Sequence, residues 1–422
     1  MLTRIGNYWV FVACLLSTSC LSCYWYYSST RSHSVSSITN VLPDVASSCC
    51  SFPQAPSIFS PDAKFLSYLP HSGLHNQRIA LENALILGKL TNRTVLVPPL
   101  RLGSNPIRYV SSDKLQIILA LAEKTGLRHC PKLRSSFIPP ECLDQDSFTH
   151  VSPAWLFNLS SWDVIYLDKL SPSAMNLDTT DILDFHDTHP YQYRFLDTNR
   201  DLATLKHKYD EVVYIPDLAN SSHKLLQLGS LFGSSRLRLR LKENKRIRTK
   251  VRRSMAFASP ELLAVASDIH KSMGGYYFGA HIRVGDGEFQ EKRDQTIQQV
   301  HQKLTNELLE RNTTWQHSSR CHGPALYIST DVPNAATDPL FATLRQSFPC
   351  TYFLSDFAAH HLAGMRNTYD GLAMWPFLVP LVDAMVVGRA EVVVGTENST
   401  FSQFIEDVLW RVHRGLGIAE RG

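Results

Sequence analysis

The sequence predicts an α/β fold of two domains with parallel sheets, preceded by a membrane anchor and a linker. Short apolar runs typical of buried strands alternate with helical segments from residue 75 onward. Repeated strand–helix alternation is typical of parallel sheets with right-handed crossovers. The length of 422 residues suits two domains. A hydrophobic content of 44% and a charged content of 19% exclude long-range disorder and collagen.

The N-terminal segment predicts the cellular compartment. Tyr8–Tyr27 is an uncharged run with aromatic residues at both ends. A helix of about 20 apolar residues spans a bilayer, and aromatic rings favour its interfaces. We therefore predict a cytoplasmic tip and signal anchor over residues 1–27, with a cleaved signal peptide as the alternative. Residues 28–60 are rich in Ser and Pro and nearly uncharged, which predicts a flexible stem.

Glycosylation sequons agree with a luminal body. Five Asn-x-Ser/Thr sequons occur, at Asn92, Asn158, Asn220, Asn312 and Asn398, and such sequons are acceptors in the secretory pathway. We predict a single-pass type II glycoprotein of the endoplasmic reticulum or Golgi. It would contact the membrane through its N-terminal helix and would not meet nucleic acid.

Four of the nine cysteines lie in the predicted body, namely Cys130, Cys142, Cys321 and Cys350. An even number in a secretory-pathway domain predicts two local disulfides, Cys130–Cys142 and Cys321–Cys350. A zinc site is the alternative, but no Cys-x-x-Cys pair or His spacing indicates one.

The first half of the body predicts helices and buried strands in alternation. Apolar residues recur at helical spacing over residues 75–90, and the TVLV run after them reads as a strand that Pro98 and Pro99 stop. The next elements are expected as a helix over 113–126 and strands over 163–167 and 211–215. We predict an N-terminal Rossmann-like domain over residues 61–253.

The second half repeats this alternation more clearly. Ser259 suits an N-cap and Pro260 suits the first turn of a helix. The expected elements are helices over 260–273, near 293–311, near 338–347, over 376–388 and from 400 to about 413, and strands over 276–282, 325–329, 351–354 and 391–395. They form the predicted C-terminal Rossmann-like domain, residues 254–422, which would bind the ligand.

Three segments are expected at the ligand-binding edge. In open α/β sheets, ligands bind at the carboxyl ends of the strands, toward which helix N-termini point. Gly73–Arg78 is a glycine turn that opens a helix, His281–Phe289 follows a strand, and Val394–Ser402 joins a strand to the last helix. Free amides at a helix start attract anions. The simpler interpretation of the first and third segments is helix capping.

Charged side chains in these segments suit a nucleotide. Arg283 can bind a diphosphate through two nitrogens, and the alternative is an ion pair with Asp286 that braces the loop. A carboxylate accepts the adjacent N–H donors of a guanine ring well, which makes Asp383 or Asp331 a candidate contact with the base. Without further context, either Asp is a surface or capping residue.

Three ordered patterns carry a family resemblance. They are Gly73-x-x-Asn76-Gln77-Arg78, His281-x-Arg283-x-Gly285-Asp286 and Gly395-Thr396-x-x-Ser399-Thr400-Phe401-Ser402. In order and strand context they resemble the three peptide motifs of the GDP-fucose protein O-fucosyltransferase family, in a fungal-type, membrane-anchored form. The segment 228–239 and the spacing from Asp383 to Thr400 fit the same pattern. The resemblance covers residues 65–415.

The resemblance implies a GT-B fold, with two facing Rossmann-like domains and GDP-fucose in the cleft. It implies inverting transfer of fucose to a hydroxyl acceptor, a protein Ser or Thr, with no cofactor and no required metal. Arg283 is the implied catalytic residue, which steadies the leaving diphosphate. The implied substrate-binding residues are Gly73, Leu74, His75, Asn76, His281, Ile282, Arg283, Asp383, Thr400 and Phe401, with Asp286, Asp331 and Ser399 as additional candidates.

Two features are not assigned by the resemblance. A general base should take the proton of the acceptor hydroxyl, and Asp286 and Glu288 are the nearby candidates. The sequence Asp144-Gln145-Asp146 resembles a metal motif, but it lies in a predicted loop and is not expected to bind metal.

A basic strip near the domain junction permits other functions. Ten Lys or Arg residues and one Glu lie between Arg236 and Arg253, a local charge of +9 in a chain of net charge +4. The strip is either a solvated connector or a source of attraction for phosphate or acidic acceptors at the cleft mouth.

Two alternative functions stay open for the whole chain. One is a fucosyltransferase that acts on glycans, and the other is a catalytically inactive relative that binds nucleotide sugars or glycans.

Overall fold

The computed structural model describes residues 60, 62–103, 106–121, 124, 130, 142, 144–167, 177–198, 208–233, 235–311, 323–357 and 361–419. These residues belong to the second of two compact units, Ser57–Gly422. The predicted anchor and all of the predicted stem except Ser60 lie outside the described residues. No helix in the described part of the chain is long and apolar enough to cross a membrane.

Five parallel strands form the main sheet of the first half, in the order β5-β2-β1-β9-β6. Their bounds are β1 Phe65–Tyr68, β2 Thr94–Val97, β5 Val164–Tyr166, β6 Ile182–Phe185 and β9 Leu225–Leu228. The strand order runs outward from β1 through β2 to β5, and β9 lies on the other side of β1. The loops that follow β1 and β9 therefore leave the sheet at a switch point, where α/β folds bind ligands.

Two smaller sheets flank the main sheet. β10, β7 and β8 form a parallel sheet, and β3 pairs with β4 in antiparallel fashion. Their bounds are β3 Leu100–Gly103, β4 Phe148–Val151, β7 Tyr193–Leu196, β8 Glu211–Tyr214 and β10 Leu237–Arg238. β8 matches the strand predicted over 211–215, whereas β3, β4 and β7 have no counterpart among the predicted strands.

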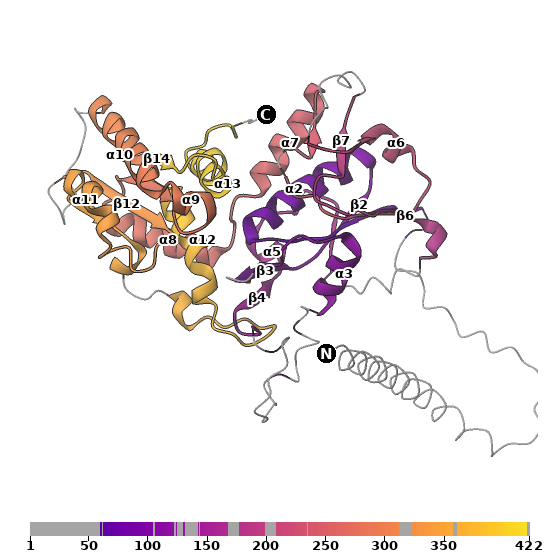
Figure 1. Cartoon of the computed structure of the whole chain (residues 1–422), viewed down its shortest axis with the longest axis horizontal. Coiled ribbons are helices and arrows are strands. Elements are labelled where there is room, and N and C mark those ends of the chain that lie inside the picture. Colours follow the sequence, from indigo (N-terminus) through magenta and orange to yellow (C-terminus); the bar gives the residue numbers. More distant parts are fainter. Residues whose placement is uncertain are drawn as a thin grey trace, which may run out of the picture. The chain divides into compact units, whose positions relative to one another are not determined.

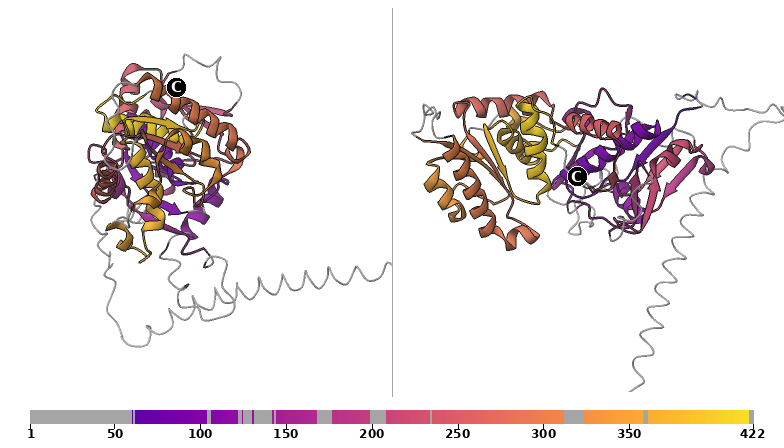
Figure 2. Two further views of the ribbon diagram at one scale, coloured as in Figure 1. Left: turned by 90° about the vertical axis from the view of Figure 1, so that its left-hand side faces the viewer. Right: turned by 90° about the horizontal axis from the view of Figure 1, so that it is seen from above.

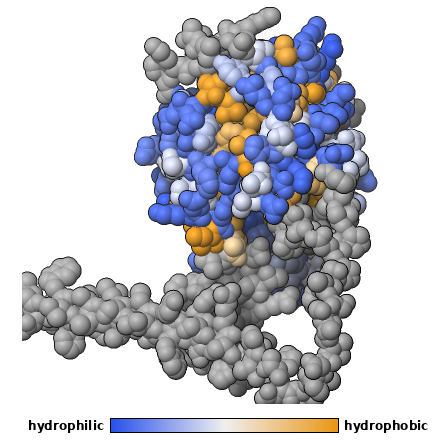
Figure 3. All heavy atoms as spheres, turned by 90° about the vertical axis from the view of Figure 1, so that its right-hand side faces the viewer, coloured by the Kyte–Doolittle hydropathy of each residue, from blue (hydrophilic) through white to orange (hydrophobic). Residues whose placement is uncertain are grey.

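The helices of the first half include α2, which is buried along most of its length. It packs against β1 and β2 and also contacts α6 and α7. The bounds are α2 Leu74–Thr91, α3 Ser112–Leu121, α5 Pro153–Leu156, α6 Ile215–Asn220 and α7 Lys242–Ser254. One outer face of this half is mostly hydrophilic, with hydrophobic side chains gathered in a narrow strip (Figure 3).

The second half contains one four-stranded parallel sheet, in the order β13-β12-β11-β14. The strands are β11 Phe278–Ile282, β12 Ala325–Thr330, β13 Cys350–Tyr352 and β14 Val392–Gly395. The helices are α8 Pro260–Ser272, α9 Gly287–Glu291, α10 Arg293–Glu310, α11 Ala342–Ser347, α12 Trp375–Val387, α13 Thr400–Phe404 and α14 Arg411–His413. The switch point of this sheet lies between β11 and β14.

The elements of each half gather in a lobe of their own (Figures 1 and 2). The predicted α/β class with parallel sheets is therefore confirmed. The predicted domain boundary, between residues 253 and 254, falls at the end of α7 and stays a prediction. The predicted last helix differs in detail, because a π-helical segment, Ile405–Trp410, separates α13 from α14.

A loop of the second half, residues 366–373, is fastened to the β3–β4 pair of the first half. We call this contact the clasp. The Oγ1 of Thr149 donates to Asp370 at 2.7 Å, and the Nδ2 of Asn367 donates to Thr149 Oγ1 at 2.7 Å. Lys124 Nζ lies 3.6 Å from Asp370, and each of these two side chains is only 8% exposed. The two halves are thus joined by buried polar contacts as well as by the chain itself.

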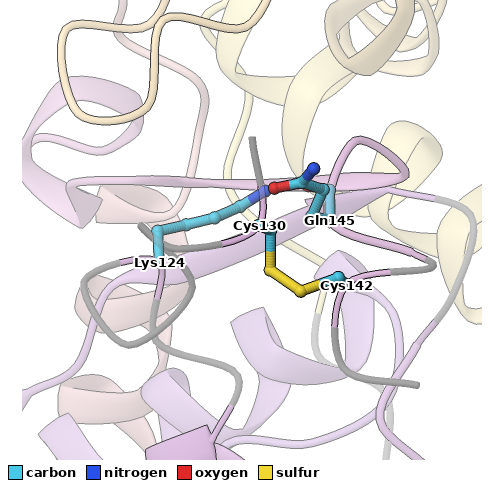
Figure 4. Close-up of a disulfide and its surroundings, with 4 residues drawn as sticks. All are labelled: Lys124, Cys130, Cys142 and Gln145. Carbon is cyan, nitrogen blue, oxygen red and sulfur yellow. A yellow bond between two sulfur atoms is a disulfide. The ribbon is translucent and has the colours of Figure 1, made fainter. Parts of the chain in front are cut away.

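One of the predicted disulfides, Cys130–Cys142, is present (Figure 4). Beside it, Lys124 Nζ donates to the carbonyl oxygen of Gln145. Cys350 is also disulfide-bonded, and its predicted partner, Cys321, lies outside the described residues.

Four of the predicted sequon asparagines are exposed, namely Asn92, Asn158, Asn220 and Asn398. The fifth, Asn312, lies outside the described residues.

Replacing Cys130 and Cys142 together by Ala should lower the free energy of unfolding by about 3 kcal/mol, the value typical of a loop of this size. The cross-link closes a short loop, at a sequence separation of 12 residues, and so restricts the unfolded chain. Urea unfolding of the double variant and the wild type measures the difference. A matched change of two exposed serines, Ser161 and Ser355, to Ala should have little effect, whereas equal stability of both double variants would contradict the prediction.

Candidate functional site

A cavity of about 420 Å³ is lined by residues of both halves. Seven predicted site residues lie on its wall, namely Gly73, Leu74, His75, Asn76, Arg283, Thr400 and Phe401. They come from the loops that follow β1, β11 and β14, at the switch points of both parallel sheets. The structure thus brings together residues from all three sequence segments.

The start of α2 forms one wall of the cavity. Gly73 is the N-cap of this 18-residue helix and supplies no side-chain cap, and the first turn contains no acidic residue. The first intrahelical hydrogen bonds are donated by the N–H groups of Asn76 and Gln77 to the carbonyl oxygen of Gly73. The N–H groups of Leu74 and His75 come before them and lie at the positive end of the helix dipole. This wall therefore suits an anion such as a phosphate.

His75 lies on the same wall, where the two halves meet. Its ring centroid is 5.2 Å from those of Phe401 and Phe404, and its Nε2 is 3.4 Å from Nη2 of Arg78. Burial lowers the pKa of His75 well below its usual value, and the charges of Arg78 and His281 act in the same direction. The imidazole is therefore neutral and adds no charge to the wall.

Arg283 supplies a guanidinium that is bound to a carboxylate. Its Nη2 lies 2.9 Å from Oδ2 and its Nε 3.1 Å from Oδ1 of Asp286, while the guanidinium carbon lies 4.7 Å from the ring centre of Phe289. Arg283 is 34% exposed and Asp286 is 64% exposed. The predicted ion pair is therefore present, but it is solvated enough for a ligand oxygen to replace the carboxylate.

The backbone of Arg283 is fixed by the third segment. Its N–H donates to Thr396 Oγ1 at 2.9 Å. Ser402 Oγ in turn accepts from the N–H of Thr396 at 3.1 Å and lies 2.7 Å from Nδ1 of His281. His281 is 6% exposed, and burial, followed by the charge of Arg283, lowers its pKa to about 4. His281 therefore braces the site from behind and does not line the cavity.

The other predicted residues near this loop also lie off the cavity wall. Asp331 accepts from the backbone N–H groups of Val284 and Gly285 at 2.9 and 3.0 Å, which shapes the loop after β11. Ile282 is fully buried in the core of the second half. Ser399 is the N-cap of α13 and accepts from the N–H of Ser402, as the capping interpretation predicted.

Asp383 lies inside the second half, on the side of α12 that faces β12. Its Oδ1 accepts a hydrogen bond of 2.5 Å from the Tyr327 hydroxyl, and the residue is 8% exposed. Burial raises the pKa of Asp383 to about 7. The cavity is lined instead by Phe377, Pro380 and Leu381 of the same helix. The predicted guanine contact of Asp383 stays a prediction.

The apolar part of the wall was not predicted. It consists of Leu102, Pro106, Phe157, Phe257, Phe377, Pro380 and Leu381. Phe377 and Leu381 share one face of α12 through their spacing of four residues, which the sequence could have indicated. Phe157 and Phe257 lie 100 residues apart in irregular segments and carried no such signal. Flat aromatic rings suit a purine base or the apolar face of a sugar.

The basic strip does not line the cavity. It forms β10 and α7, and all of its residues are described. Arg236 is fully buried, and its guanidinium donates to the carbonyl oxygens of Tyr193 and Phe232. The expectation of a solvated connector is therefore wrong for this residue. The guanidinium groups on the cavity wall belong to Arg78 and Arg283.

Within the described ranges, no group of three His, Cys, Asp or Glu side chains is placed to hold a metal ion. Asp144 and Asp146 are exposed in the turn before β4. Glu288, one of the two predicted base candidates, lies 3.5 Å from Lys292 and is likewise absent from the cavity wall.

Comparison with known proteins gives one short sequence match. A stretch of 61 residues is 41% identical to O-fucosyltransferase 30 of Arabidopsis thaliana, covering 13% of this chain and 12% of that relative. The matched part is therefore a small fraction of the relative's length. No family model matches the chain.

Comparison with solved structures gives distant matches to fucosyltransferases, at low sequence identity. POFUT1 in complex with GDP-fucose is 10% identical, with a TM-score of 0.44 over 85% of this chain and 96% of its own. The fucosyltransferase NodZ from Bradyrhizobium is 12% identical, with a TM-score of 0.38 over 82% of this chain and 93% of its own. Likenesses this distant do not determine an activity.

Proposed function

We propose that this chain is a glycosyltransferase that transfers fucose from GDP-fucose to a hydroxyl group, with inversion. The observation that carries the proposal is the convergence of three ordered motif segments on one cavity: the start of α2, Arg283 after β11, and Thr400 with Phe401 at the start of α13. The short plant match, to a protein named as an O-fucosyltransferase, supports the same class.

The chemistry of the wall fits this reaction. Negative charge builds up on the departing GDP as the fucose C1–O bond breaks, and pre-placed cations and amides stabilise such charge. The guanidinium of Arg283 and the first amides of α2 would bind the diphosphate, once the phosphate oxygens replace Asp286 at Arg283. The apolar rings of the wall would hold the guanine base or the sugar. We propose a protein Ser or Thr as acceptor, and a luminal position on a type II anchor.

Calorimetry with the full chain in detergent tests the donor assignment. We expect GDP to bind with similar affinity in the presence and absence of Mg²⁺, because the wall offers guanidinium and amide groups to the diphosphate. UDP is the matched control and should bind more weakly. GDP release from a panel of nucleotide sugars should then be fastest with GDP-fucose. Absence of GDP binding in both conditions would refute the assignment.

A further inference from the structure

A chain of three hydrogen-bonded side chains leads from the cavity wall into the first half. His71 follows β1 and Ser230 follows β9, so both lie at the switch point of the main sheet. Nδ1 of His71 lies 2.8 Å from Ser72 Oγ, and its Nε2 lies 2.7 Å from Ser230 Oγ. Ser72 lines the cavity, whereas His71 and Ser230 are each 3% exposed. A hydroxyl on the cavity wall is thus connected to a buried imidazole.

The backbone holds Ser72 in an unfavourable conformation. Its φ of 65° lies in the left-handed region, which costs a residue other than Gly about 1 kcal/mol. The conformation is fixed because the N–H of Ser72 donates to the carbonyl oxygen of Ile107 at 2.6 Å, and its own carbonyl accepts from Gln77 Nε2 at 3.1 Å. Such strain gathers at functional sites, where surrounding contacts maintain it.

The surroundings of His71 keep its ring neutral. The ring packs edge-on against Tyr109 and Phe232, at centroid distances of 5.0 and 5.8 Å. Burial, followed by the charge of Arg236, lowers the pKa of His71 to about 4. A neutral imidazole has one nitrogen free to accept a proton. At this pKa it is about as basic as an ordinary carboxylate.

The two carboxylates nearest to Arg283 in sequence are exposed, and each is paired with a basic side chain. Asp286 is bound to Arg283, and Glu288 lies 3.5 Å from Lys292. Neither of them lines the cavity. The transfer nevertheless needs a group that removes the proton of the acceptor hydroxyl, and the Ser72–His71 pair is hydrogen-bonded and opens on the cavity.

We propose that Ser72 and His71 form the proton relay of the transfer reaction, an inference that rests on the proposed function. The acceptor oxygen bonds to C1 of fucose, and the bond from C1 to the GDP oxygen breaks with its electron pair leaving on GDP. The acceptor proton passes to Ser72 Oγ as the hydroxyl proton of Ser72 passes to Nδ1 of His71. Nε2–H stays hydrogen-bonded to Ser230, and the imidazolium returns its proton to solvent after GDP leaves. Ser72 is then the catalytic residue, and His71 acts through it.

The test measures GDP release from GDP-fucose with water as acceptor, using the full chain in detergent. Ser72→Ala should lower the rate at saturating donor by about 10²-fold, a typical effect of losing an acid–base group. The affinity for GDP should stay within about twofold, because the diphosphate contacts do not use this hydroxyl. Ser72→Gly should show the same loss of rate and the same unchanged affinity for GDP. It should also fold, because Gly tolerates the left-handed backbone. Ser272→Ala, at the end of α8, is the matched control.

His71→Asn separates a relay from a structural role. Asn can keep a hydrogen bond to Ser72 but cannot take a proton, so the relay predicts a loss like that of Ser72→Ala. Ser72 variants that release GDP at the wild-type rate would overturn the relay and leave the proposed function standing. A loss of GDP affinity in these variants, or normal release by His71→Asn, would also overturn it. Failure of the wild-type chain to bind GDP would refute the proposed function and the relay with it.

Discussion

Replacing Arg283 by Ala is expected to slow GDP release from GDP-fucose by about 10²–10³-fold, the typical cost of losing one group that stabilises the charge of a transition state. The melting temperature should hardly change. Arg283 is a third exposed and its partner Asp286 is more so, and exposed ion pairs contribute only about 0–1 kcal/mol. Steady-state release assays and thermal unfolding of the same preparation measure both quantities.

Two variants serve as controls for this prediction. Arg283→Lys keeps the charge but not the planar pair of donors, so it should recover only part of the rate. Asp286→Asn removes the competing carboxylate, so it should strengthen GDP binding. If Arg283→Ala released GDP normally, or if it unfolded several degrees earlier, the ion pair would be a structural brace and the catalytic role would be refuted.

Replacing Asp383 by Asn is expected to stabilise the chain at pH 8 but not at pH 4. The pKa of Asp383 is raised from 3.8 to about 7 by burial. Between these values the folded state keeps a proton that the unfolded state has lost, so the stability of the wild type falls as the pH rises through this range. Asn avoids the buried charge and still accepts from Tyr327. The gain at pH 8 has an upper limit of about 4 kcal/mol.

Urea unfolding of wild type and variant at both pH values measures this effect. Asp217→Asn, at an exposed position of α6, is the matched control and should show no such difference between the two pH values. An equal effect of Asp383→Asn at pH 4 and pH 8 would contradict the raised pKa.

The same variant also tests the predicted guanine contact. A tenfold weaker binding of GDP would support the contact, and unchanged binding would confine Asp383 to the core.

Much of the fold could be predicted because its central elements have clear periodicity. The expected helices over 75–90 and 293–311 and the strand over 325–329 agree with the structure to within one residue at each end. The clasp and the β3–β4 pair could not be predicted in this way. They depend on contacts such as Thr149 with Asp370, which lie 221 residues apart and leave no local pattern.

The candidate site was predicted only in part, because some of its residues follow predicted strands and others depend on contacts that leave no local pattern. Arg283 and Thr400 follow the strands predicted over 276–282 and 391–395, so their positions at the sheet edge follow from topology. Gly73 follows β1, a strand that was not predicted. Ser72 was overlooked because nothing in the sequence shows that its backbone turns left-handed or that His71 lies against its hydroxyl. The basic strip stands out in the sequence by its charge, but the charge pattern does not show that Arg236 is buried among carbonyl groups.

The clasp limits how the polypeptide can be divided. Lys124 belongs to the first half and Asp370 to the second, and each buries a charge that the other neutralises. A cut between α7 and α8 would place the two partners on separate fragments, each with a charged group exposed to water in its free form. We expect such fragments to be recovered best by co-expression. The cavity wall contains residues of both fragments, so it should exist only in their complex.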